Sequence, residues 1–318
     1  MELINEKFAA SLAVRVRDKR MYDFYGYIQP YMRALRGIVA RNGHVRHDIK
    51  YAEIDCSFED MKDLALAFFK EFNEEMYHNI DSILKDANLR YSEPQEANRG
   101  ALNSVGGDGK TLNIDLNPTN DVEGLCVVAH EFSHVGSERN VKKVREKEQL
   151  LGEIESKFIE KVYSKWLCEN GVINKVEYNK KAEAQLRSLV VDCEMAVEES
   201  ELLAALNNDF SVDNLRKVFN GARDRRRTEE VLTRLAYGKD GNDDFWGKYV
   251  SRYIVGEIVA QVLFEEYQQT PADTEQRFAE FMRKNAELGF EEGIKLLLGE
   301  NYIEKVNRTF FPNAERED

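Results

Sequence analysis

Val127-Val-Ala-His-Glu-Phe-Ser-His134 is the most informative stretch of this sequence, because it contains the pattern HExxH. Residues four apart lie on the same face of a helix, so the imidazoles of His130 and His134 can bind one Zn²⁺. Glu131 directly follows the first histidine and can take a proton from a metal-bound water as a general base. Two of the five histidines in the chain fall in this motif. The pattern therefore predicts a site for one zinc ion.

The flanking residues predict that the motif lies on a helix that follows a strand. Asn120 and Glu123 have the spacing of a capping box at a helix start. An apolar stripe at helical spacing is formed by Leu125, Val128, Phe132 and Val135. At 100° per residue, the two histidines fall on the opposite side of that helix. We expect the preceding segment, Leu112–Leu116, to be an edge strand that could pair with an extended peptide.

A catalytic zinc site needs a third protein ligand and keeps one position for water. No histidine follows His134, so a glutamate on a following helix is the natural choice. Glu153, Ser156 and Glu160 have the spacing of one helix face. We expect Glu153 to be the ligand, with Ser156 and Glu160 behind it and Glu160 fixing the tautomer of a ligand histidine. Glu155 is the main alternative for the third ligand.

These motifs carry a resemblance to a known family. His130-Glu-Phe-Ser-His134 followed by Glu153-x-x-Ser156-x-x-x-Glu160 resembles the thimet oligopeptidase and oligoendopeptidase F family of zinc metallopeptidases, the gluzincins. Arg99-Gly-Ala-Leu-Asn and Thr111-Leu-Asn-Ile-Asp-Leu-Asn are similar to the two strands that precede the family's active-site helix. Tyr249-Val-Ser-Arg-Tyr253 is similar to its tyrosine-bearing C-terminal helix. The resemblance covers roughly residues 57–310.

The resemblance implies a fold and a mechanism. It implies a mainly α, zincin-like peptidase domain with a small β-sheet, which binds one Zn²⁺ and cleaves peptide or protein substrates. Tyr249 and Tyr253 would donate hydrogen bonds to the oxyanion of the transition state. The substrate backbone would lie beside the two strands that contain Gly100, Ala101, Leu112 and Ile114.

The sequence also departs from the family pattern. Family members are usually much longer than 318 residues, and they place a histidine before the C-terminal tyrosines, where this chain has none. Ser251 can occupy the position of one tyrosine. A shortened chain predicts a more open cleft that accepts protein segments. Two other interpretations stay open: a zinc-stabilised binding or regulatory protein without catalysis, and a helical interaction protein in which HExxH is fortuitous.

Composition limits the remaining possibilities. The 318 residues include 45 Lys and Arg against 58 Asp and Glu, a net charge of −13, which disfavours a nucleic-acid partner. No apolar run approaches the length of a membrane span. The N-terminal Met1–Lys7 carries two glutamates where a signal peptide has net positive charge, which favours a cytoplasmic location. The four cysteines have no CxxC pair, so neither a cysteine zinc site nor a disulfide framework is indicated. The oligomeric state stays unknown.

The pattern along the chain predicts one compact unit over 1–318. We divide it into an N-terminal helical and extended region (1–56), a core with strands and both motif helices (57–170), and a helical region (171–318). The elements expected before the motif are a helix over 21–41, a strand within 44–55, one long helix from Ser57 to about Ala87, and two strands near 99–104 and 111–116. Ser57-Phe-Glu-Asp60 resembles a capping box at the start of the long helix.

Overall fold

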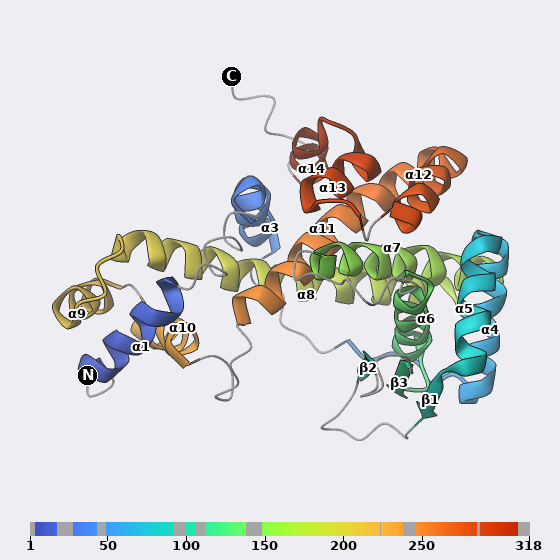
Figure 1. The fold of residues 1–318 in the computed structure, drawn as a ribbon, viewed down its shortest axis with the longest axis horizontal. Coiled ribbons are helices and arrows are strands. Elements are labelled where there is room, and N and C mark those ends of the chain that lie inside the picture. The colour runs from blue at the N-terminus through green and yellow to red at the C-terminus, as the bar shows by residue number, and fades with distance from the viewer. Residues whose placement is uncertain are drawn as a thin grey trace. The chain divides into compact units, whose positions relative to one another are not determined.

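In a computed structural model of the chain, most elements are helices (Figure 1). The structure describes residues 4–17, 28–42, 49–91, 100–105, 112–137, 148–222, 224–237, 246–284 and 287–310. These include one small sheet of three strands. The predicted fold class, mainly α with a small β-sheet, is confirmed.

The contacts divide the chain into two compact units, each made of segments that are distant in sequence. Unit 1 comprises 1–45, 187–255 and 306–318, and unit 2 comprises 46–186 and 256–305. Both HExxH and the glutamate-rich helix that follows it lie in unit 2. The predicted single unit over 1–318 stays a prediction.

The sheet lies in unit 2. Its strands are β1 (Asn88–Tyr91), β2 (Gly100–Val105) and β3 (Leu112–Asn117), in the order β1-β3-β2. β3 pairs in parallel with β1 and antiparallel with β2. The two predicted strands are therefore confirmed, but the expectation that 112–116 is an edge strand is wrong. β1 contains one half-buried apolar residue, Leu89, among exposed residues, and so gives little strand signal in the sequence.

Two helices, α4 (Phe58–Phe72) and α5 (Glu74–Asp86), occupy the place of the single predicted helix. The capping box at Ser57 is confirmed: its hydroxyl accepts from the Asp60 amide, and the Asp60 carboxylate accepts from the Ser57 amide at 2.8 Å. The helix is interrupted at Asn73, which has an extended backbone. Its side chain accepts a hydrogen bond from the Met76 amide at 2.8 Å. An asparagine that caps a new helix thus ends the predicted one.

No strand is observed in the described part of the segment 44–55, where one was predicted. Residues 43–48 lie outside the described part of the chain, and 49–57 have no regular secondary structure. Backbone amides of this segment donate hydrogen bonds to a loop carbonyl and to a side chain, and not to a neighbouring strand. The Ile54 amide donates to the Asn120 carbonyl at 2.8 Å, and the Ala52 amide donates to the Glu177 carboxylate at 3.0 Å. Such long-range partners give no local pattern in the sequence.

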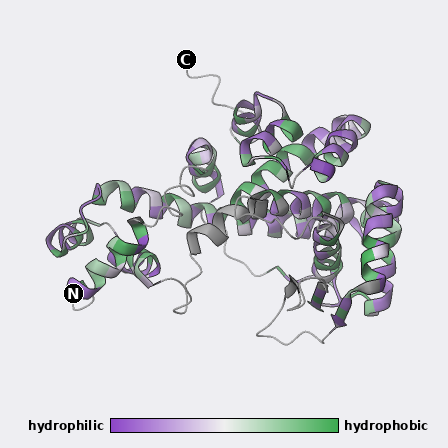
Figure 2. Cartoon of the chain, in the orientation of Figure 1, coloured by the Kyte–Doolittle hydropathy of each residue, from purple (hydrophilic) through white to green (hydrophobic). Residues whose placement is uncertain are grey.

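The motif helix is α6 (Val122–Ser137), which packs against α7 (Glu148–Glu169). Its predicted stripe of Leu125, Val128, Phe132 and Val135 is fully buried, and Figure 2 shows α6 as predominantly hydrophobic. The helix is capped by Asp121, which accepts from the Gly124 amide at 3.0 Å, and not by the predicted Asn120. A Cβ on Gly124 would lie 1.7 Å from the Thr119 carbonyl oxygen, so this close approach requires glycine.

Aromatic side chains from several helices surround α7 in unit 2. The Phe158 ring lies 4.8 Å from that of Phe278 and 6.3 Å from that of Phe72. These contacts fix α7 between α4 and the C-terminal helices of the unit. The helices that complete unit 2, wholly or in part, are α8 (Lys175–Leu206), α11 (Trp246–Gln269), α12 (Pro271–Lys284), α13 (Phe290–Leu298) and α14 (Tyr302–Phe310).

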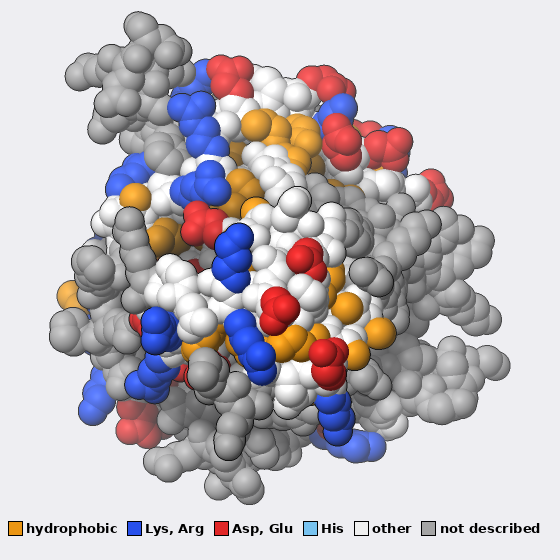
Figure 3. Space-filling model, turned by 90° about the vertical axis from the view of Figure 1, so that its left-hand side faces the viewer, with side chains coloured by type: hydrophobic (Ala, Val, Ile, Leu, Met, Phe, Trp, Pro, Cys, Tyr) orange, Lys and Arg blue, Asp and Glu red, His pale blue; other side chains and the backbone are white. Residues whose placement is uncertain are grey.

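Unit 1 has its own hydrophobic cluster, in which Phe8, Leu12, Leu206, Leu215 and Leu232 are fully buried. Besides parts of α8, α11 and α14, its elements are α1 (Glu6–Arg17), the 3₁₀ turn η1 (Gln29–Tyr31), α3 (Met32–Asn42), α9 (Val212–Gly221) and α10 (Arg225–Tyr237). Figure 3 shows one face of the molecule. Among the described residues on this face, Lys and Arg side chains lie between Asp and Glu side chains. Among the described residues, no helix combines the length and apolar character that a membrane span requires.

Candidate metal centre

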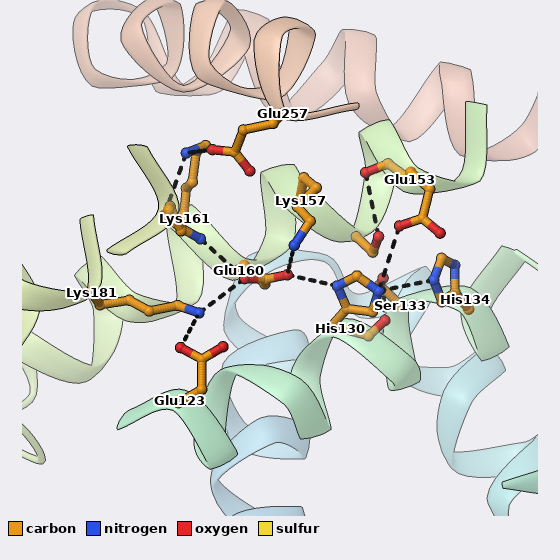
Figure 4. Close-up of polar contacts among 12 residues, drawn as sticks. Glu123, His130, Ser133, His134, Glu153, Lys157, Glu160, Lys161, Lys181 and Glu257 are labelled. Carbon is orange, nitrogen blue, oxygen red and sulfur yellow. Dashed lines mark hydrogen bonds and ion pairs between the residues drawn. The ribbon is translucent and has the colours of Figure 1, made fainter. Parts of the chain in front are cut away.

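Three side chains from α6 and α7 bring their potential ligand atoms together (Figure 4). The Nε2 atoms of His130 and His134 are 3.1 Å apart, and His130 Nε2 lies 3.8 Å from Glu153 Oε2. One ligand atom from each of the three residues lies within 4.8 Å of the other two. In a tetrahedral zinc site with bonds of about 2.0–2.1 Å, ligand atoms are separated by about 3.3 Å. The donor types and their spacing therefore fit a divalent metal ion such as Zn²⁺.

Glu153 is held in place by close packing between α7 and α11. A Cβ on Gly256 would lie 3.0 Å from both the carbonyl carbon and the Cβ of Glu153. The absence of a side chain at Gly256 thus lets α11 approach the backbone of α7 at this residue. Glu155, the alternative predicted ligand, is also fully buried, but it is not part of the three-residue group.

A contact at the second ring nitrogen, Nδ1, fixes the orientation of His130. Its Nδ1 lies 2.7 Å from Glu160 Oε1. Burial favours the neutral form of Glu160, but the charges of Lys157 and Lys181 outweigh burial and hold the pKa of this carboxyl well below its ordinary value. An ionised carboxylate can only accept, so Nδ1 of His130 is the donor in this contact. In the neutral imidazole, Nε2 then carries no proton and is the nitrogen that can bind a metal ion.

Glu131 is buried next to these ligands. Its pKa is raised, chiefly by desolvation, against the opposing effect of His130. A carboxylate with a raised pKa accepts a proton more readily than an ordinary one at neutral pH. The environment therefore suits the predicted general base.

The two remaining residues of the glutamate-rich face behave differently. Glu160 lies behind His130, as described above. Ser156 is buried and donates to the Glu153 carbonyl at 3.3 Å, one turn earlier in the same helix. Ser156 thus supports the backbone of α7 at Glu153 and does not reach the histidines through this bond.

Three residues that surround Glu160 were not predicted from the sequence to belong to the site: Lys157, Lys181 and Gln185. Lys157 Nζ lies 2.7 Å from Glu160 Oε1, Lys181 Nζ lies 3.1 Å from Oε2, and Gln185 Nε2 donates to Oε2 at 3.0 Å. Lys157 has a local signal, since it lies three residues before Glu160 on the same helix. Lys181 and Gln185 are one turn apart on α8, but only the tertiary fold brings them to Glu160.

The residues predicted to contact substrate are only partly described. Gly100 and Ala101 lie in β2, and Leu112 and Ile114 lie in β3. The Ile114 side chain is fully buried, and its strand β3 pairs with β1 on one side and β2 on the other. The side chains of Ala101 and Leu112 fall outside the described part.

The two tyrosines do not share a unit with the metal ligands. Tyr249 and Tyr253 lie in the part of α11 that belongs to unit 1. The side chain of Tyr249 is outside the described part, and that of Tyr253 is partly buried. Their role as oxyanion donors therefore stays a prediction.

The fold and the donor set together define a mainly α-helical domain with a candidate metal centre. No family model matches the chain, and no curated protein sequence matches it. In structure, it is similar to a candidate oligoendopeptidase F from Bacillus anthracis strain Ames, with a TM-score of 0.56 and 14% identity over 95% of this chain and 55% of that one. A candidate peptidase from Chlamydophila abortus gives a TM-score of 0.48 and 15% identity over 96% of this chain and 55% of that one.

The likeness to the Bacillus anthracis protein establishes a fold relationship with a candidate peptidase. This chain spans about half the length of both of these proteins.

Proposed function

We propose that this protein is a zinc-dependent metalloendopeptidase. The observation that carries the proposal is the meeting of His130 Nε2, His134 Nε2 and Glu153 Oε2, with Glu131 buried beside them. Two neutral imidazoles and one carboxylate are the ligand set of a catalytic zinc site that keeps a position for water. The fold shared with a candidate oligoendopeptidase F supports the same class.

In the proposed mechanism, each residue has a separate role. When bound, Zn²⁺ supplies a Lewis acid that lowers the pKa of a water and polarises the scissile carbonyl. His130, His134 and Glu153 hold the ion. Glu131 takes the proton of the attacking water and passes it to the leaving amine. Glu160 keeps the proton of His130 on Nδ1, which leaves Nε2 directed at the ion.

The substrate in this proposal is an extended peptide or a protein segment. Because β3 is the middle strand, its backbone pairs on both sides with the other described strands. The outer strands are β1 and β2, and β2 packs against α6, the helix that carries both histidines. Addition of the peptide along β2, which contains Gly100 and Ala101, would place a scissile bond near that helix.

A variant of the general base tests this function. We expect Glu131→Gln to keep one zinc per chain and to lose at least about 100-fold in peptide cleavage, because the amide cannot take the proton. Wild type and variant would be compared on a library of quenched peptides and a panel of proteins, with zinc measured by mass spectrometry. Glu169→Gln, at the exposed end of α7, is the matched control. Undiminished cleavage by Glu131→Gln would contradict the mechanism, and zinc binding without any cleavage by wild type would favour the non-catalytic binding protein.

A further inference from the structure

Beside the metal ligands lies a buried group of charged and amide side chains that the proposed reaction does not use directly. Its centre is Glu160, whose two carboxylate oxygens contact His130, Lys157 and Lys181 (Figure 4). Gln185 also donates to this carboxylate. The side chain of Glu160 is 6% exposed and that of Lys181 is 3% exposed. Nearly all of the partners of both groups are therefore protein atoms.

Lys181 joins three helices at this point. It extends from α8 and lies 3.1 Å from Glu160 on α7 and 2.8 Å from Glu123 on α6. α6 carries the two histidines, and α7 carries Glu153. One ammonium group thus connects both of the helices that supply the metal ligands.

A second series of contacts reaches Glu160 Oε2, the oxygen that Lys181 also contacts. Glu257 on α11 pairs with Lys161, and Lys161 Nζ donates to Gln185 Oε1 at 3.4 Å. Because the Gln185 oxygen faces a lysine, its amide nitrogen is the atom that points to Glu160. Lys181 and Gln185, one turn apart on α8, therefore approach Glu160 Oε2 together.

The burial of Lys181 is informative because it is energetically costly. Removing an ammonium group from water destabilises the fold unless the group is well paired, and an apolar side chain of similar size often serves stability as well or better. Lys181 is buried where it meets the carboxylate that orients a candidate metal ligand. Its position is thus better explained by the geometry of that carboxylate than by stability alone.

We propose that Lys181 is a positioning residue of the metal centre, which holds Glu160 against Nδ1 of His130 so that Nε2 stays directed at the ion. The inference rests on the metal centre of the proposed function. It extends the centre beyond the three ligands and Glu160 to a residue of a third helix.

The test is the affinity for Zn²⁺, measured by competition with a chromophoric chelator. We expect Lys181→Met to bind zinc about 10-fold more weakly than wild type, as for loss of an outer contact to a ligand histidine. Lys180→Met is the matched control, since Lys180 is the next residue on α8 but pairs with Glu177 and the Lys50 carbonyl. Its affinity should equal that of wild type. Equal affinities for Lys181→Met and wild type would overturn the proposal.

A double-variant cycle shows whether Lys181 acts through Glu160. On a Glu160→Gln background, Lys181→Met should cause no further loss of zinc affinity, whereas an additional 10-fold loss would overturn the proposal. The double variant carries neither buried charge of this pair, so it also serves if Lys181→Met alone fails to fold by circular dichroism.

Nitrogen NMR of histidine-labelled, zinc-free protein gives a readout that a purely structural role would not change. The spectra are compared at a pH where the His130 imidazole is neutral. There, His130 in wild type should carry its one proton on Nδ1, and in Lys181→Met it should show a mixture of tautomers. A neutral His130 with its proton on Nε2 in wild type would overturn the proposal. These measurements do not depend on peptide cleavage. If the protein cleaves no peptide but its zinc affinity depends on Lys181, the proposed function is refuted and this inference stands.

Discussion

The choice between Glu153 and Glu155 as third ligand is a question about single residues. Both side chains are buried on α7, but only Glu153 brings a carboxylate oxygen to the histidines. We expect Glu153→Ala to lose its zinc, because two imidazoles alone bind the ion weakly. Glu155→Gln should keep one zinc per chain. The measurement is zinc content after dialysis, and retention by Glu153→Ala with loss by Glu155→Gln would reverse the assignment.

Gly124 is the second residue whose role can be tested alone. A Cβ at this position would lie 1.7 Å from the Thr119 carbonyl oxygen, so the start of α6 would have to move. We expect Gly124→Ala to lower the free energy of unfolding by about 2–4 kcal/mol, as for other sterically incompatible core substitutions. Urea titration measures the change. Gly221→Ala is the control, since no atom beyond its chain neighbours and the adjacent backbone of its own helix lies within 4 Å of its Cβ position. A loss as small as in this control would contradict the account of α6.

At the scale of elements, the approach of α11 to α7 sets the place of Glu153. We expect Gly256→Ala to destabilise the protein by about 1–3 kcal/mol, because its Cβ would lie 3.0 Å from Glu153. The same variant should bind zinc more weakly, since the contact is at the ligand itself. Denaturant titration and chelator competition measure the two effects. Full stability with unchanged zinc affinity would show that α11 does not set the position of α7.

The elements also show what could be predicted from the sequence. The buried stripe of α6, the capping box at Ser57 and strands β2 and β3 have local patterns, so they were predictable. The middle position of β3 depends on β1, whose sequence has almost no alternation. The approach of Lys181 to Glu160 depends on the packing of α8, which no spacing in the sequence encodes. Local periodicity thus predicts elements, whereas the partners of a buried group are set by tertiary contacts.

At the scale of the whole molecule, metal binding and folding should be coupled, because the ligands come from two different helices. An ion that binds the folded chain and not the unfolded chain stabilises it by mass action. We expect removal of zinc by a chelator to lower the thermal midpoint and to increase hydrogen exchange in α6 and α7. Zinc added back should restore both. An unchanged midpoint and unchanged exchange would contradict a metal centre between these helices.

The central claim is that one zinc ion and Glu131 together make this protein a peptidase. The most direct measurement is the initial rate of hydrolysis of a quenched peptide as zinc is titrated into metal-free protein. For wild type, the account predicts a rate that rises with zinc and saturates at one ion per chain, whereas Glu131→Gln binds the same amount of zinc and stays at the background rate. A wild-type rate that is independent of zinc, or equal rates for the two proteins, would contradict it.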